Sequence, residues 1–83
     1  MADPKVIDSK YNRHVTRDGA TVELCIYRLE DTKWTLELVD ANGTSIVWDD
    51  EFDTDDAAFG MFLRAIDEEG GLDSLIRDPK RSH

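Results

Sequence analysis

The chain of 83 residues has one cysteine, two prolines and no long apolar run, and these shortages exclude several classes of protein. Because Cys25 is the only cysteine, no internal disulfide can form. Its apolar neighbours in the sequence, Leu24 and Ile26, predict a buried and unreactive thiol. No stretch approaches the roughly 20 apolar residues that a membrane-spanning helix needs, and no basic and apolar signal segment opens the chain. We therefore expect a cytoplasmic protein without a membrane partner.

Positive charge is scarce in the second part of the chain. Residues 1–33 carry six basic and six acidic side chains, whereas residues 34–83 carry four basic and thirteen acidic ones. The whole net charge of −9 therefore belongs to the second part. A surface of this sign repels a phosphate backbone, so we do not expect a nucleic-acid partner. A basic protein partner, a cation or simple solubility remain open as explanations.

Alternating apolar and polar residues predict a sheet. The period of two that is typical of half-buried strands occurs in residues 9–16, 20–29, 34–40 and 44–48. The connections are short, so consecutive strands are expected to pair as neighbours. The last two strands are joined by Asn42-Gly43, a pair that accepts positive φ and is the strongest short signal for a hairpin.

A helix is predicted from Asp55 to Glu69. Asp53 or Thr54 can accept hydrogen bonds from its first backbone N–H groups, and Gly70-Gly71 can end it in the left-handed conformation. An apolar stripe recurs at helical spacing and comprises Ala58, Phe59, Phe62, Leu63 and Ile66. Gly60 interrupts this pattern at a cost of about 1 kcal/mol relative to alanine. Close packing on the sheet or simple tolerance would explain it, and a binding role is the less favoured alternative.

The predicted fold class is α+β, with a four-stranded antiparallel β-meander followed by one long C-terminal helix packed on one sheet face. Residues 1–8 are expected to form a flexible arm, residues 9–76 a single domain, and residues 77–83 a disordered tail. One helix covers about one face of the sheet. The other face is left for solvent or for a second copy of the chain. Both faces of the strand at residues 20–29 are partly apolar, so the sequence favours a homodimer through this exposed face.

The order of these segments resembles that of the YegP-type small β-β-β-α domains, whose function is unknown. The resemblance covers about half of the chain and is carried by Ile26-Tyr27, Trp34 to Leu38, Asn42-Gly43, Ile46 and Ala57 to Ile66. The chain departs from that family's pattern in its acidic loop and in its additional first strand. Because the family has no settled activity, the resemblance implies a fold but no mechanism.

Six carboxylates in eight residues form the most prominent motif. They are Asp49, Asp50, Glu51, Asp53, Asp55 and Asp56. The EF-hand pattern fails here, because a calcium loop that starts at Asp49 would need glycine and glutamate where Thr54 and Gly60 stand. The motif can be a solvated loop and helix cap, a docking surface for a basic protein partner, or a weak cation site, and charge runs are most often solvated. We assign no metal ligand and no cofactor to it.

Nothing in the sequence has the spacing of a known catalytic motif, so no catalytic residue is assigned. The sequence favours a non-catalytic protein-interaction or regulatory module. The alternative is a small ligand-binding domain or enzyme, with a pocket between the sheet and the helix or at a dimer interface. Its support is the set of polar residues on strands, namely Tyr11, His14, Tyr27 and Glu37.

Overall fold

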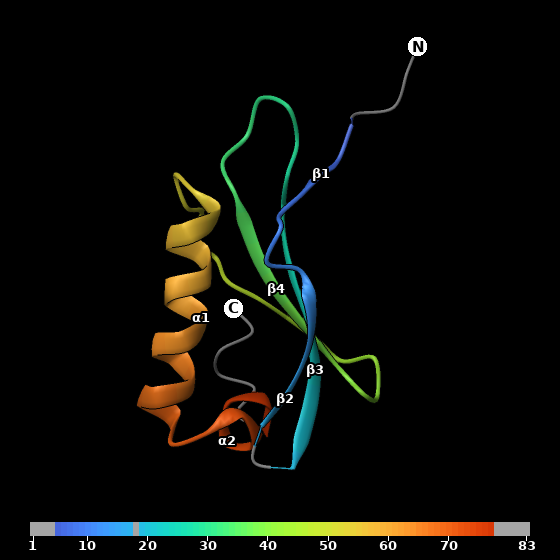
Figure 1. The fold of residues 1–83 in the computed structure, drawn as a ribbon, viewed down its shortest axis with the longest axis vertical. Helices are drawn as coiled ribbons and strands as arrows, with labels where there is room; N and C mark the ends of the chain where they lie inside the picture. Colours follow the sequence, from blue (N-terminus) through green and yellow to red (C-terminus); the bar gives the residue numbers. More distant parts are fainter. Residues whose placement is uncertain (1–4, 18, 78–83) are drawn as a thin grey trace.

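The computed structural model describes residues 5–17 and 19–77, which form an antiparallel sheet with two helices on one side (Figure 1). The elements are, in chain order, β1 (Ile7–Asp8), β2 (Arg13–Arg17), β3 (Ala20–Arg28), β4 (Thr35–Asp40), β5 (Ser45–Val47), α1 (Asp55–Glu69) and α2 (Leu72–Arg77). The α+β class and the antiparallel sheet are confirmed. The sheet has five strands rather than four. The predicted helix is present with its predicted bounds and has 15 residues, and it is not the last element, because a second helix of six residues follows it.

The additional strand arises because one edge of the sheet is broken. Both β1 and β2 pair with β3, so they follow one another along the same edge. In the gap between them, Ser9 donates its backbone N–H to the carbonyl of Ile26 at 2.9 Å. The side-chain Oδ1 of Asn12 accepts from the backbone N–H of Ile26 at 2.7 Å. A side chain thus replaces a strand hydrogen bond. Of the predicted strand over residues 9–16, only residues 13–16 lie in a strand, β2, and β1 precedes the predicted strand.

The ends of the chain lie partly outside the described residues. Residues 1–4 of the predicted arm and residues 78–83 of the predicted tail are among those not described. Ile7 and Asp8, also assigned to the arm, pair with Arg28 and Tyr27 of β3. Arg77 is the last residue of α2.

The predicted hairpin is present between β4 and β5, with a longer turn than the Asn-Gly pair implied. Asp40 donates its backbone N–H to Thr44 at 2.9 Å, and Gly43 donates to Asp40 at 3.0 Å. Three residues therefore form the loop, and Gly43 takes a φ of 83°, as in a type I turn followed by a left-handed residue. The carboxylate of Asp40 accepts from the backbone N–H groups of Asn42 and Thr44, which holds this wider turn in place.

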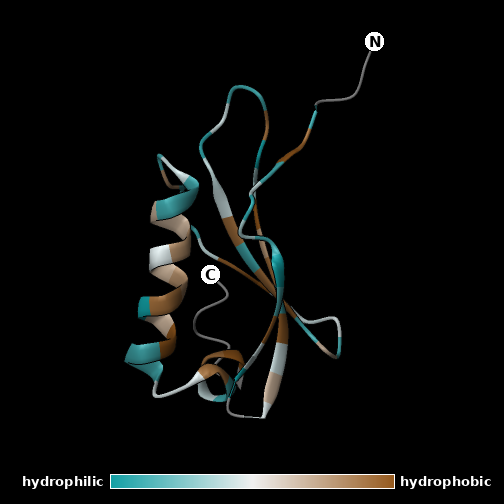
Figure 2. Cartoon of the chain, in the orientation of Figure 1, coloured by the Kyte–Doolittle hydropathy of each residue, from teal (hydrophilic) through white to brown (hydrophobic). Residues whose placement is uncertain are grey.

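The helices bury the apolar face of the sheet. Thr54 begins α1 by accepting from the backbone N–H of Ala57 at 3.0 Å, and Gly70 ends it with a φ of 84°. The core comprises Ala20, Val22, Leu24, Ile26, Leu36, Leu38, Ala58, Phe62, Ala65, Ile66, Leu72 and Leu75. Figure 2 shows apolar stretches on β3, β4 and α2, whereas the ends of α1 are hydrophilic. The predicted packing of a helix on one sheet face is thus observed, and α2 completes the cover.

Candidate functional site

A bulge after β5 carries three of the six predicted docking carboxylates. Trp48 donates its backbone N–H to Leu36 at 3.1 Å, and Phe52 exchanges two backbone hydrogen bonds of 2.8 and 2.9 Å with Trp34. Between these paired positions β4 has only Thr35, whereas the opposite segment has the three residues from Asp49 to Glu51. The surplus residues are pushed away from the sheet edge, as in other β-bulges. All three side chains are exposed.

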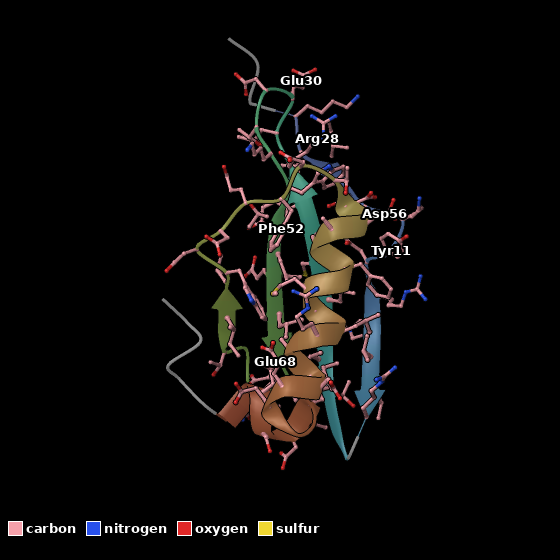
Figure 3. All side chains as sticks on the ribbon, turned by 90° about the vertical axis from the view of Figure 1, so that its left-hand side faces the viewer. Tyr11, Arg28, Glu30, Phe52, Asp56 and Glu68 are labelled. Atoms are coloured by element: carbon pink, nitrogen blue, oxygen red, sulfur yellow. The ribbon has the colours of Figure 1, made fainter. Side chains whose placement is uncertain are left out.

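The other three carboxylates make contacts within the fold. Asp53 forms an ion pair of 3.2 Å with Lys33, in which both side chains are largely exposed. Asp55 accepts from the hydroxyl of Ser9 at 2.9 Å, and Ser9 is only 7% exposed. Asp56 accepts from the hydroxyl of Tyr11, and the two residues lie side by side at the start of α1 (Figure 3). Asp55 and Asp56 connect the first turn of α1 to neighbouring segments, and Asp53 does the same for the residues just before the helix.

Tyr11 joins the broken sheet edge to α1. Its ring stacks on that of Phe59, with centroids 4.3 Å apart and planes inclined by 4°. The hydrogen bond to Asp56 raises the pKa of the Tyr11 hydroxyl, because ionisation would place two negative charges together. The predicted docking carboxylates are therefore of two kinds. Asp53, Asp55 and Asp56 have partners in the fold, whereas no hydrogen bond or ion pair within the described residues engages the side chains from Asp49 to Glu51.

The face of the sheet that points away from the helices, which we name the open face, carries a second group of polar residues. On β3 and β4, alternation places Glu23, Cys25 and Tyr27 beside Glu37 on this face. The Tyr27 hydroxyl donates to Oε1 of Glu37 at 3.1 Å, and the hydroxyl of Ser45 donates to Oε2. Two donors from neighbouring strands thus hold the Glu37 carboxylate in one orientation.

Burial and nearby carboxylates disfavour ionisation on the open face. Burial, followed by the hydrogen bond to Glu37, raises the pKa of Tyr27. Burial also raises the pKa of the Cys25 thiol, with further contributions from the charges of Glu23, Glu37 and Asp8. The thiol is half-buried rather than fully buried as predicted, because it lies on the open face instead of in the core. Its unreactive character stays a prediction, which the raised pKa supports.

Two hollows lie over the open face. One, of about 430 Å³, is lined by Val6, Asp8, Asn12, Glu23, Cys25, Tyr27 and Glu37. The other, of about 120 Å³, is lined by His14, Thr21, Val22, Glu23, Val39, Asp40 and Ala41. Because Glu23 lines both, the hollows adjoin one another along β3.

The four residues proposed for a pocket are not brought together. Tyr27 and Glu37 share the larger hollow, and His14 lines the smaller one. Tyr11 stacks on α1 on the opposite side of the sheet. The larger hollow also includes Asp8, Asn12, Glu23 and Cys25, which sequence reasoning did not assign to a site. Alternation along residues 20–29 could have grouped Glu23 with Cys25 and Tyr27, but the neighbours from β1 and β4 depend on the strand register.

No protein-family model, curated protein or solved structure matches the chain. The resemblance to YegP-type domains therefore stays a prediction. Among the described residues, no helix is long and apolar enough to cross a membrane, and no three His, Cys, Asp or Glu side chains are grouped so that they could hold a metal ion.

Proposed function

We propose that the chain is a non-catalytic protein-interaction module that docks a basic protein partner. The observation that supports this function is the exposed bulge from Asp49 to Glu51. Its three adjacent carboxylates project from the edge of the sheet, and within the described residues no hydrogen bond or ion pair engages them. A concentrated negative patch of this kind attracts positively charged surfaces and accelerates their association.

Binding through exposed charges has a characteristic dependence on salt. The Debye length falls from about 10 Å at 0.1 M ionic strength to about 3 Å at 1 M, so the attraction between exposed charges weakens as salt is added. A partner held by the bulge should therefore be captured at low salt and released at high salt. A partner held by apolar contacts would not be released in this way.

The test compares two charge-matched triple variants. D49N/D50N/E51Q neutralises the bulge, and E30Q/D31N/D67N removes the same number and types of charge from exposed positions elsewhere. The immobilised protein is used to capture partners from a cell lysate at low and high salt, and the retained proteins are identified by mass spectrometry. We expect the bulge variant to lose a basic, salt-sensitive partner that the control variant keeps. Equal capture by the two variants would refute the proposal.

A ligand-binding domain is the second candidate, and the larger hollow is the observation that favours it. The sequence placed such a pocket between the sheet and the helix or at a dimer interface. The larger hollow lies on the open face, whereas the core residues fill the space below α1. The homodimer through the open face also stays a prediction, and its test accompanies the inference below.

A further inference from the structure

The open face has no cover among the described residues, although it is not simply a polar surface. On the other side of the sheet, α1 and α2 bury the apolar side chains (Figure 1). On the open face, Val6 is 55% exposed and Val47 is 36% exposed, while Cys25 and Tyr27 are half-buried. An antiparallel sheet can leave one face in water, but that face is then usually polar. Exposed apolar and negatively charged groups occur together here.

The larger hollow combines an apolar lining with carboxylates from three strands. Val6, Cys25 and the ring of Tyr27 supply the apolar part. Asp8 lies opposite Tyr27 in the register of β1 and β3, and Glu37 lies opposite Cys25 in the register of β3 and β4. Together with Glu23 on β3, these carboxylates surround the apolar part. Such an arrangement suits a group that has an aliphatic stem and a positively charged end.

A lysine side chain has this chemistry. Its four methylene groups can lie on the Tyr27 ring and Val6, and its ammonium group has three N–H donors for carboxylate oxygens such as those of Glu37. The Glu37 carboxylate can accept further hydrogen bonds, because it has about four lone-pair sites. The Tyr27 and Ser45 hydroxyls use one site on each oxygen, which leaves the others for an ammonium group. The adjoining hollow shares Glu23 with the larger one, and His14 is the one basic side chain in its described lining.

We propose that the open face binds a lysine-bearing segment of a protein partner, with a lysine side chain in the hollow between Asp8, Glu23 and Glu37. This site is separate from the bulge and does not depend on the function proposed for Asp49 to Glu51. Charge complementarity identifies the occupant. A second copy of the chain would bring an identical set of carboxylates against this one, and opposed like charges disfavour such an interface.

The test is a titration of the ¹⁵N-labelled protein with tetralysine that is acetylated at its N-terminus and amidated at its C-terminus. The same peptide with all four side chains acetylated is the control, because it keeps the stem and loses the charge. We expect tetralysine to shift the backbone amide signals of Cys25, Tyr27 and Glu37 in a saturable way, and the control to leave them unchanged. The Glu37→Gln variant should weaken binding by about five-fold, whereas Glu30→Gln should not.

Three outcomes would overturn the proposal. Shifts confined to residues 49–51 would place the peptide on the bulge, which would leave the function proposed for the bulge intact. Equal shifts with the acetylated control would show that charge is not recognised. Shifts of the same open-face signals on dilution of the protein alone would show that a second copy covers the face. Glu37→Gln retains one acceptor oxygen for one of the Tyr27 and Ser45 hydroxyls, and the other hydroxyl can accept from the new NH2 group. Its amide spectrum shows directly whether the variant is folded.

Discussion

The side chain of Asn12 should be worth far more to stability than a polar residue at a sheet edge usually is. Its Oδ1 accepts the backbone N–H of Ile26 at 2.7 Å, in the gap where neither β1 nor β2 pairs with β3. Ile26 is fully buried, so water cannot easily replace this acceptor. The Asn12→Ala variant would leave the buried N–H without a partner, which costs about 1–3 kcal/mol. Asn12→Asp keeps an acceptor oxygen in a side chain of the same shape.

The assay is urea unfolding followed by tryptophan fluorescence, since Trp34 and Trp48 both pack against the core. We expect Asn12→Ala to lower the free energy of unfolding by about 1–3 kcal/mol and Asn12→Asp to lower it by less than half of that amount. The slope of free energy against urea concentration should stay the same, because the core is unchanged. A loss below about 0.5 kcal/mol for Asn12→Ala would show that the Ile26 N–H finds another partner and would refute the reasoning.

Three further predictions concern α1 and the open face. Thr54→Ala should lower the free energy of unfolding by about 1 kcal/mol, because the Ala57 N–H loses its cap, whereas Thr54→Ser should lose little; equal losses in the two variants would contradict the role of the hydroxyl. Gly60→Ala should raise the free energy of unfolding by about 1 kcal/mol, because a Cβ there meets nothing within 4 Å; a loss would contradict this. Because the Cys25 pKa is raised, alkylation of the thiol by iodoacetamide should need a higher pH than alkylation of a small free thiol, and Glu23→Gln should shift the pH dependence of the alkylation rate back toward lower pH. If Cys25 of the unsubstituted protein reacted with the pH dependence of a small thiol, the prediction would be wrong.

Periodicity was sufficient to predict the parts of the fold in which side chains simply alternate. The strand at residues 20–29 is observed as Ala20–Arg28, and the helix boundaries Asp55 and Glu69 are observed without change. In these segments burial, capping and propensity favour the same structure, so local reasoning succeeds. The same agreement explains why Gly70 ends α1.

The broken edge could not be predicted in this way. Ser9 and Asn12 occupy positions that fit an ordinary strand pattern, and nothing in the pattern shows that their side chains bond to a distant backbone or carboxylate. The bulge was missed for a related reason. The acidic run predicts charge and exposure, but only the pairing of Trp34 with Phe52 shows that Asp49 to Glu51 are surplus residues.

The open face could be predicted only in part, since it depends on contacts between strands. Alternation places Glu23 on the side of β3 opposite Val22 and Leu24, but only the register brings Asp8 and Glu37 near it. That register is strongly constrained. A slip of one residue would turn Glu23 into the core and Val22 into water, which the packing of α1 forbids. The core therefore positions the side chains of the open face, although these side chains contribute little to the core. Each carboxylate on the open face can be neutralised by itself, and we expect the open face to keep its shape.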